Sequence, residues 1–428
     1  SSGVVFDGSL NFFSISPLMQ ACVIARDTRT GVDPSYLMVI AAQTSAGGAL
    51  YVEQGCMVIE HSGKDAKGLT IYDNGSITAH GGALDIQGNV WSSGQMAFKG
   101  CHSDESGGAA MIRGSLTQNG GRMSFDACTA IATGGAVFVG GSLNSDGIMV
   151  FNGCQAGEEG GAVMTSGDFK HLAGRMNFIS CNAAARGGAV AVYGSLFVQG
   201  IMEFSGCEAK EGGAAMVDMD ITQAAKSRMS FDACAAAVKG GGAIMASGDF
   251  KQIAGRVKFT SCTAMTKGAV STDNLVTSGF MDFDGCNAEE EGGAVMASGD
   301  FKQLNGTEAG GALYLQQGLT MISGAVTDGG GLYVHSGGLL QEGGNIKLRS
   351  SHSNEGRGGG LMIADGGLRQ LAGDISCQNC SAKTGGCLAV GSRARVTAGV
   401  HLRGSIVARN CVATAGHERE WRGLAYSN

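Results

Sequence analysis

The sequence predicts an all-β fold, a right-handed, single-stranded parallel β-helix with about 26 residues and three short strands per coil. Three observations predict this fold. Glycine provides 74 of the 428 residues whereas proline provides 2, and two short motifs, Gly-Gly-Ala and Phe-x-x-Cys, recur with nearly constant spacing. A motif that returns with a fixed period of roughly 20 to 50 residues is the sequence signature of a solenoid.

The Gly-Gly-Ala motif is followed by an apolar residue and runs along nearly the whole chain. Between Gly48 and Gly386 there are 13 intervals over 338 residues, an average of 26 residues per repeat. Because glycine lacks a Cβ atom, we expect these positions to form sharp corners of the coil. The second glycine of each copy, degenerate copies included, is Gly48, Gly82, Gly108, Gly135, Gly161, Gly188, Gly213, Gly242, Gly268, Gly293, Gly311, Gly330, Gly359 and Gly386.

The Phe-x-x-Cys motif lies between these corners and predicts an internal ladder. Its cysteines follow one another at intervals of 24 to 28 residues: Cys101, Cys128, Cys154, Cys181, Cys207, Cys234, Cys262 and Cys286. In a stacked solenoid every position becomes a column of like residues about 4.8 Å apart. We expect these cysteines to form a structural ladder of small, buried, reduced thiols, with disulfide bonds between adjacent coils as the alternative.

Each repeat contains three stretches of three to five residues in which apolar residues alternate with other residues. Alternation with period two predicts strands. The first stretch follows Gly-Gly-Ala, the second is a Ser-Leu segment, and the third is Met-x-Phe, whose two apolar residues face the same side. Methionine beside phenylalanine fills an irregular interior well. The near absence of proline fits strands that donate hydrogen bonds to both neighbours.

The repeat divides the chain into three parts. Residues 1–46 are expected to hold a partial first coil and an irregular loop with both prolines, Pro17 and Pro34. Residues 47–412 hold the β-helix repeats, which become degenerate and shortened near 304–330. Residues 413–428 lose the repeat, which predicts a tail or a cap. Since the sequence starts inside a coil, its first coil is expected to expose a sheet edge that can recruit another chain.

The composition excludes several classes of protein. A hydrophobic share of 43% with only 16% charged residues argues against disorder. A formal charge of −7 argues against a nucleic-acid partner bound through a basic surface. No apolar run approaches the roughly 18 residues of a membrane helix, so no transmembrane segment is expected.

One charged motif recurs and is the candidate binding surface. The segment SGDFK occurs three times in the turn after the Gly-Gly-Ala strand, and it contributes Asp168, Lys170, Asp249, Lys251, Asp300 and Lys302. A catalytic centre of a β-helical polysaccharide lyase or hydrolase would gather acids with Arg or Lys on one face. Repetition in the same local context is more typical of a patterned surface than of one catalytic centre, so we expect no catalytic residues.

A second charged column precedes the Gly-Gly-Ala corner. It runs through Glu158 and Glu159, Arg186, Glu211, Lys239, Lys267 and Glu291. The sign of the charge mostly alternates from coil to coil, and like charges on adjacent strands repel. We therefore expect this column to specify the stacking register.

The remaining chemistry-bearing residues do not predict a cofactor or a metal. Cys377, Cys380 and Cys387 resemble a metal cluster, but a zinc site needs a fourth ligand at suitable spacing and none is present. Cys380 also stands where the repeat places its cysteine, and Cys387 replaces the alanine of Gly-Gly-Ala. The eight histidines show no common spacing and no metal-binding motif.

The alternation of Gly-Gly-Ala-(Ile/Leu/Val) with a Phe-x-x motif resembles the repeats of chlamydial polymorphic outer membrane proteins. The first half matches at 47–50, 81–84, 134–137, 160–163, 187–190, 241–244, 292–295 and 310–313. The second half departs from that family, because cysteine replaces the asparagine of Phe-x-x-Asn. Such Phe-x-x-Cys arrays are similar to those of large repeat proteins from unicellular algae and other protists. The resemblance implies a secreted β-helix that acts in adhesion.

The leading hypothesis is therefore a non-enzymatic, rigid structural or adhesive rod, a segment of a larger extracellular or cell-surface protein or filament. Its expected partners are other protein chains, bound through coil ends or lateral faces and including copies of itself, and glycans. The alternative is a β-helix that binds or cleaves polysaccharide in a lateral groove.

Overall fold

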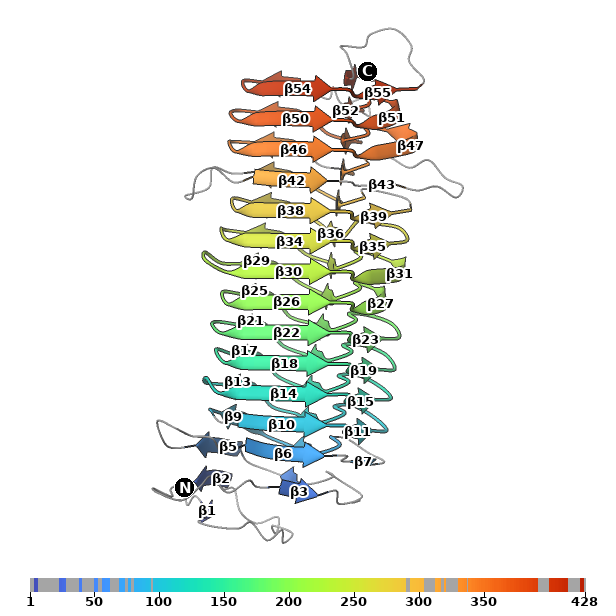
Figure 1. Ribbon diagram of the computed structural model, residues 1–428. Helices are drawn as coiled ribbons and strands as arrows, with labels where there is room; N and C mark the ends of the chain where they lie inside the picture. The colour runs from blue at the N-terminus through green and yellow to red at the C-terminus, as the bar shows by residue number, and fades with distance from the viewer. Residues whose placement is uncertain are drawn as a thin grey trace. The chain divides into compact units, whose positions relative to one another are not determined.

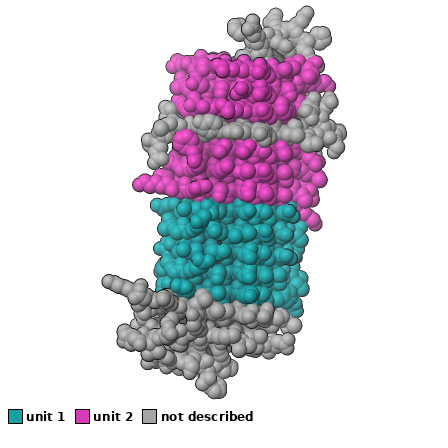
Figure 2. Space-filling model, viewed as in Figure 1, with its two compact units in different colours: residues 1–209 teal, residues 210–428 magenta. Residues whose placement is uncertain are grey.

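The structure of the chain is a computed structural model. It describes residues 81–93, 95–289, 293–303, 330–336, 338–391 and 400–414, and outside these ranges it gives strand bounds alone. The chain divides into two compact units, residues 1–209 (unit 1) and 210–428 (unit 2), which Figure 2 distinguishes by colour.

The chain is all-β, and over the described residues its parallel strands stack as a β-solenoid of about 11 turns with roughly 27 residues per turn (Figure 1). Within the described ranges every regular element is a strand, and no helix there could cross a membrane. The predicted parallel β-helix is thus confirmed. A complete coil carries four strands, however, where the sequence predicts three, so that each unit is built from four parallel sheets.

The first sheet, named the GGA sheet, contains the strands that follow the Gly-Gly-Ala corners. Most of its three-residue strands are buried along their whole length. In unit 1 it contains β4 (Leu50–Val52), β8 (Leu84–Ile86), β12 (Ala110–Ile112), β16 (Val137–Val139), β20 (Val163–Thr165) and β24 (Val190–Val192). In unit 2 it contains β28 (Ala215–Val217), β32 (Ile244–Ala246), β36 (Val270–Thr272), β40 (Val295–Ala297), β44 (Leu332–Val334), β48 (Leu361–Ile363), β52 (Leu388–Val390) and β56 (Leu424–Tyr426).

The second sheet, named the Leu sheet, contains the predicted Ser-Leu segments. Its strands typically bury their first and third residues and expose the middle one to a greater extent. In unit 1 it contains β1 (Val4–Phe6), β2 (Val23–Asp27), β5 (Cys56–His61), β9 (Asn89–Ser92), β13 (Leu116–Gln118), β17 (Leu143–Ser145), β21 (Phe169–His171) and β25 (Leu196–Val198). In unit 2 it contains β29 (Ile221–Gln223), β33 (Phe250–Gln252), β37 (Leu275–Thr277), β41 (Phe301–Gln303), β45 (Leu339–Gln341), β49 (Leu368–Gln370) and β53 (Val400–Leu402).

The third sheet, named the Phe sheet, contains the five-residue Met-x-Phe strands. Their second and fourth residues point inward, as the alternation predicts. In unit 1 it contains β3 (Met38–Ile40), β6 (Leu69–Asp73), β10 (Gln95–Lys99), β14 (Arg122–Asp126), β18 (Ile148–Asn152), β22 (Arg175–Ile179) and β26 (Ile201–Ser205). In unit 2 it contains β30 (Arg228–Asp232), β34 (Arg256–Thr260), β38 (Phe280–Asp284), β42 (Ala312–Gln316), β46 (Asn345–Arg349), β50 (Asp374–Gln378) and β54 (Ser405–Arg409).

The fourth sheet, named the Cys-Ala sheet, follows the ladder cysteine and is the one that the sequence does not predict. Many of its strands have two residues, too few to display an alternating pattern. In unit 1 they are β7 (Ser76–Ile77), β11 (His102–Ser103), β15 (Thr129–Ala130), β19 (Gln155–Ala156), β23 (Asn182–Ala183) and β27 (Glu208–Glu211), the last of which continues past residue 209. In unit 2 they are β31 (Ala235–Lys239), β35 (Thr263–Ala264), β39 (Asn287–Ala288), β43 (Leu319–Thr320), β47 (His352–Arg357), β51 (Ser381–Thr384) and β55 (Val412–Ala413).

The core of each unit is a column of stacked phenylalanine rings from the Phe sheet. In unit 1 the rings of Phe98, Phe125, Phe151, Phe178 and Phe204 follow one another with centroids 4.7 to 4.9 Å apart and nearly parallel planes. In unit 2 the column runs through Phe231, Phe259 and Phe283, with centroids 4.9 and 4.5 Å apart. The distance between ring centroids equals the distance between neighbouring parallel strands. The rings therefore stack when the strands are in register, and a shift in register would separate them.

The Gly-Gly-Ala corner requires both of its glycines, for different reasons. Gly134 has a φ of +64°, a left-handed conformation that disfavours a side chain. At Gly135 a Cβ atom would lie 2.0 Å from the carbonyl oxygen of Gly161 in the next coil. The corner therefore brings two backbones together at a distance that excludes any side chain.

One predicted corner is wrong. We expected Gly311 to open a strand like the other Gly-Gly-Ala copies, within a shortened region near 304–330. The strand that follows it, β42, instead pairs with β38 in the Phe sheet, and the next GGA-sheet strand is β44, which pairs with β40. Strand pairing therefore places β42 within a single coil that begins with β40, and the next coil begins with β44.

The other predicted boundaries fall largely beyond the described residues. The predicted partial coil and loop at 1–46 lie outside them except for strand bounds. At the other end, β55 ends at Ala413 and β56 pairs with β52 in the GGA sheet, so strands of the repeat lie within the predicted tail. The rest of the predicted tail, 415–428, lies outside the described residues apart from the bounds of β56.

Candidate functional site

The recurrent Asp and Lys of SGDFK lie at the start of Leu-sheet strands and pair with each other. The Lys170 ammonium is 3.3 Å from the Asp168 carboxylate, and Lys302 is 3.0 Å from Asp300. Lys251 lies between two carboxylates, 3.1 Å from Asp249 and 2.8 Å from Asp220. The side chains in these pairs are partly exposed, so each ion pair contributes at most about 1 kcal/mol to stability.

The aspartates also belong to a polar ladder, which we name the corner ladder. At this position the side-chain oxygen of one coil accepts a hydrogen bond from the backbone N–H of the same position in the next coil. In unit 1 these bonds run from Ser115 N to Asn89 Oδ1 (2.7 Å), Ser142 N to Ser115 Oγ (3.1 Å), Asp168 N to Ser142 Oγ (3.2 Å) and Ser195 N to Asp168 Oδ1 (3.1 Å). In unit 2 they run from Asp249 N to Asp220 Oδ1 (2.9 Å), Asp300 N to Asn274 Oδ1 (2.7 Å) and Gly338 N to Asp300 Oδ1 (3.0 Å).

Three carboxylates of the corner ladder, those of Asp168, Asp220 and Asp300, have a lowered pKa. The hydrogen bond from the Ser195 backbone lowers the pKa of Asp168, and the one from Gly338 lowers the pKa of Asp300. Lys251 lowers the pKa of Asp220, and Asp220 in turn raises the pKa of Lys251. Acid catalysis needs a carboxyl group that stays protonated near neutral pH, whereas each of these shifts favours the charged carboxylate.

The predicted Asp–Lys pairs lie in different coils. Asp168 and Lys170 belong to unit 1. In unit 2 the other two pairs are separated by the coil that contains β37, where Asn274 occupies the ladder position and its side-chain amide donates a 2.7 Å hydrogen bond to Asp249. Each SGDFK coil therefore carries its own Asp–Lys ion pair, and in one of them Lys251 also reaches Asp220 of the preceding coil.

The cysteines of the expected ladder occupy the interior of the coils. The eight cysteines of the Phe-x-x-Cys motif are fully buried and belong to no disulfide. In five of these cysteines the Sγ lies 3.5 to 3.9 Å from two carbonyl oxygens. One belongs to the phenylalanine of the preceding coil, and the other to the residue two positions before the cysteine itself. The five are Cys128, Cys154, Cys181, Cys207 and Cys262. Hydrogen bonds with neighbouring ladder thiols, together with burial, raise the pKa of Cys128 and Cys181. Cys128 and Cys181 are therefore protonated at neutral pH, whereas hydrogen bonds from neighbouring ladder thiols lower the pKa of Cys154 and Cys262.

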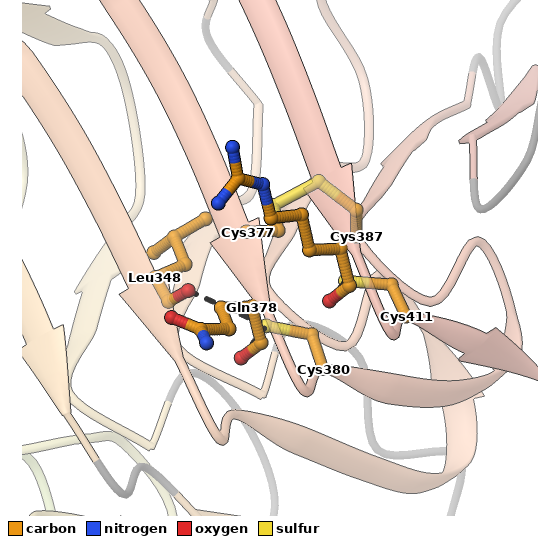
Figure 3. The surroundings of a disulfide bond; sticks show 7 residues. Leu348, Cys377, Gln378, Cys380, Cys387 and Cys411 are labelled. Atoms are coloured by element: carbon orange, nitrogen blue, oxygen red, sulfur yellow. Dashed lines mark hydrogen bonds between the residues drawn. A yellow bond between two sulfur atoms is a disulfide. The ribbon is translucent and has the colours of Figure 1, made fainter.

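The cysteines near the C-terminal end have a different arrangement. Cys377 and Cys387 form a disulfide with a Cα–Cα distance of 5.6 Å (Figure 3). Cys377 occupies the column position of the core phenylalanines, and Cys387 that of the Gly-Gly-Ala alanine, so the disulfide crosses the core between the Phe sheet and the GGA sheet. Cys380 continues the ladder position and is buried beside them. Nowhere in the described ranges do three or more His, Cys, Asp or Glu side chains come together as a metal site.

Sequence reasoning missed a second buried polar column, here named the inner polar column. It consists of the third residue of six Leu-sheet strands: Gln118, His171, Gln223, Gln252, Gln341 and Gln370. In each, Nε2 lies 3.0 to 3.3 Å from the carbonyl oxygen of the residue that opens the Phe-sheet strand of the next coil. The signal was present as the recurrent string Leu/Ile/Phe-x-Gln, which interrupts an otherwise apolar inward pattern.

His171 is the one histidine of the inner polar column. Its ring is fully buried, Nε2 is 3.1 Å from the carbonyl oxygen of Ile201, and Nδ1 has no hydrogen-bond partner among the described residues. Since the carbonyl can only accept, Nε2 carries the proton of the neutral ring. Burial lowers the pKa of His171. A neutral imidazole therefore replaces a glutamine amide at this corner.

The charged column before the Gly-Gly-Ala corner contains one closed cluster in unit 1. Glu159 and Arg186 form a β-bridge and an ion pair, in which Arg186 Nε donates a 2.7 Å hydrogen bond to the Glu159 carboxylate. The Tyr193 hydroxyl donates to the other carboxylate oxygen at 2.9 Å, and the guanidinium carbon lies 5.6 Å from the tyrosine ring centre. Glu159 and Arg186 lie on adjacent coils and carry opposite charges, as the alternation of sign in the sequence predicts. In unit 2, Lys239 and Lys267 place two like charges in succession.

Comparisons with protein-family models, with curated proteins and with solved structures found no match. The resemblance to polymorphic outer membrane proteins accordingly rests on the repeat motif itself.

Proposed function

We propose that this chain is a non-enzymatic structural or adhesive β-solenoid, a rigid segment of a larger extracellular or cell-surface protein or filament. One observation carries the proposal. The residues that recur and could have supplied chemistry, the aspartates of SGDFK and the ladder cysteines, are engaged with the neighbouring coil by hydrogen bonds. A repeated residue used in this way sets register, and its repetition then needs no ligand to explain it.

The energetic reasoning favours a segment that resists deformation. Four backbone ladders connect the coils, and in many coils the phenylalanine column, the corner ladder or the inner polar column adds side-chain contacts. In a solenoid each repeat contacts its neighbours alone, and stability is close to a sum of repeat and interface terms. Backbone ladders that recur from coil to coil therefore distribute resistance to deformation along the segment.

The enzymatic alternative can be tested with the full chain. It would be incubated with acidic and neutral polysaccharides, with and without calcium, while the release of unsaturated sugars or reducing ends is measured. We expect no product. Product formation that disappears when Asp168, Asp249 and Asp300 are each replaced by Asn would overturn the proposal. Asn is the matched replacement because Asn274 already occupies the corner ladder and accepts its hydrogen bond.

The proposed self-assembly needs its own measurement. Light scattering of the purified chain over a wide range of concentrations should show a mass that grows with concentration. A constant mass equal to one chain would exclude assembly between copies and leave other proteins or glycans as partners.

Glycan binding is the second candidate, and a specific surface in unit 1 favours it. The outward middle residues of consecutive Leu-sheet strands form the column Trp91, Thr117, Asn144, Lys170 and Phe197. Trp91 is 37% exposed. Aromatic rings separated by polar side chains offer apolar faces and hydrogen-bond groups to a sugar chain. The parent chain should then bind glycans on an array. Trp91→Ala should abolish this binding, and Thr222→Ala, at the equivalent position in unit 2, should leave it unchanged. Equal binding by both variants would exclude this surface.

A further inference from the structure

Cys411 differs from the other thiols of the ladder in its exposure. Of the reduced cysteines in the described ranges, it alone is not buried. It stands three residues after Ala408, which occupies the core phenylalanine position of β54, and so it takes the ladder position of its coil. A reagent in solution can therefore reach the column at Cys411, and the remaining ladder thiols are closed to it.

The neighbour of Cys411 in the preceding coil is Cys380, and the backbone holds the two in register. Gln378 pairs with Arg409 on one side of them, and Ser381 pairs with Val412 on the other. The Val412 N–H donates a 2.9 Å hydrogen bond to the carbonyl oxygen of Cys380. Neighbouring parallel strands lie about 4.8 Å apart, which is inside the range of Cα separations that a disulfide spans. Figure 3 shows the two side chains close to the existing disulfide.

On its other side Cys380 has no thiol neighbour in the ladder. Ser351 occupies that position, and its hydroxyl donates to the carbonyl oxygen of Arg349 at 3.5 Å. Cys377, three residues before Cys380, is already joined to Cys387. The ladder thus ends in two thiols, the accessible one of Cys411 and the buried one of Cys380. Ser351 separates this pair from the other ladder cysteines of unit 2.

We propose that Cys411 and Cys380 form a dithiol site that reacts by thiol–disulfide exchange with a low-molecular-weight disulfide. The Cys411 thiolate attacks one sulfur of the reagent, which forms a mixed disulfide and releases one thiolate. The Cys380 thiol loses its proton to solvent and attacks the Cys411 sulfur, which forms the Cys380–Cys411 disulfide and releases the second thiolate. The reagent is reduced to two thiols by the two electrons that the dithiol gives up.

The electrostatics of the pair support this division of roles. A hydrogen bond with the Cys380 thiol lowers the pKa of Cys411 to about 6. Hydrogen bonding with Cys411 and burial raise the pKa of Cys380. The accessible sulfur is then the nucleophile at neutral pH, and the buried one keeps its proton until the mixed disulfide has formed. The product would tie the coil that contains β55 covalently to the one before it.

The test treats the native, full-length chain with oxidised glutathione and maps disulfides by peptide mass spectrometry after trypsin digestion. The expected product joins the peptides 370–383 and 410–419, with peptide 384–393 attached through the existing disulfide. Two molecules of reduced glutathione should be released per chain at this site. Peptide mapping keeps this reaction separate from any at Cys22 and Cys56, which lie outside the described residues.

Variants distinguish the two roles. Cys380→Ser should stop the reaction at a glutathione adduct on Cys411, and Cys411→Ser should abolish reaction at both positions. Cys154→Ala is the matched control, since it alters a buried ladder thiol of unit 1, and it should leave the product unchanged. An unmodified Cys411 in the folded parent, or a glutathione adduct that persists there although Cys380 is present, would overturn the proposal.

Discussion

Replacing His171 with Gln should stabilise the chain at acidic pH and leave it almost unchanged at neutral pH. Gln118 makes the equivalent bond in the same unit, with Nε2 donating to the Ile148 carbonyl at 3.2 Å, as His171 does to Ile201 at 3.1 Å. The substitution therefore keeps the capping hydrogen bond and removes the one titratable group of the inner polar column. No cavity is expected, because glutamine already fills this corner in five other coils.

The sign of the effect follows from the pKa of His171, which burial lowers below its usual value. Between the folded pKa and about 6.5 the unfolded chain binds a proton that the folded chain does not, so the free energy of unfolding rises with pH. The neutral ring's contribution is fully present above about 6.5 and is lost as the pH falls toward the folded pKa. Each unit of the shift corresponds to about 1.4 kcal/mol.

The assay is urea denaturation of the parent and of His171→Gln at pH 7.5 and pH 5. The difference between the variants should be below about 0.5 kcal/mol at pH 7.5 and reach about 1 kcal/mol or more at pH 5 in favour of glutamine. Gln370→His is the reciprocal variant, since Gln370 makes the same bond and its Oε1 is buried without a hydrogen-bond partner. It should introduce the pH dependence. If His171→Gln loses stability between the two pH values as the parent does, the reasoning is refuted.

Three further predictions concern the columns that set register. Asp168→Ala should lower the free energy of unfolding by about 1 kcal/mol and Asp168→Asn by less, because Asn loses the ion pair with Lys170 but keeps the acceptor for the Ser195 N–H; equal losses in urea would contradict the corner ladder. Gly135→Ala should prevent correct folding, because its Cβ would meet a carbonyl oxygen at 2.0 Å. Gly153→Ala should lower the free energy of unfolding by about 1 kcal/mol, since no atom lies within 4 Å of a Cβ there. Similar melting temperatures of the two variants, measured by circular dichroism, would argue against the close approach at Gly135. Phe178→Ala should lower the free energy of unfolding by about 3 to 5 kcal/mol, and Phe178→Leu should lower it by less, because Leu348 occupies the same column in unit 2. Chemical denaturation measures both losses. Equal losses would show that stability does not depend on the volume that the column fills.

Much of the fold could be predicted from the sequence because each coil repeats the same requirements. The Gly-Gly-Ala corner, the Met-x-Phe strand and the buried cysteine recur with enough regularity to reveal period, strands and core. The fourth strand escaped prediction because the Thr129–Ala130 pair is too short to show a period. Gly311 was misplaced because the same letters can open strands of two different sheets, and strand pairing rather than local sequence decides between them.

The candidate sites were predicted less completely, for a reason of distance along the chain. The partner of Asp168 is the backbone N–H of Ser195, 27 residues later, and only the stacked structure brings them together. The Cys377–Cys387 disulfide joins the recognised alanine position of Gly-Gly-Ala to a position whose place in the phenylalanine column is shown by strand pairing. Their proximity follows from the packing of the Phe sheet against the GGA sheet across the interior, a relation that a single repeat does not display.

Pulling the full chain from its two ends in a single-molecule force experiment tests the central claim most directly. A structural segment held coil by coil should extend in steps whose contour length is a multiple of one turn, roughly 27 residues or about 90 Å. Cys154→Ala and Asp168→Asn should give the same step length. Extension without steps, at a force no higher than that for an unfolded chain, would contradict the proposal that these repeated columns make a rigid structural segment.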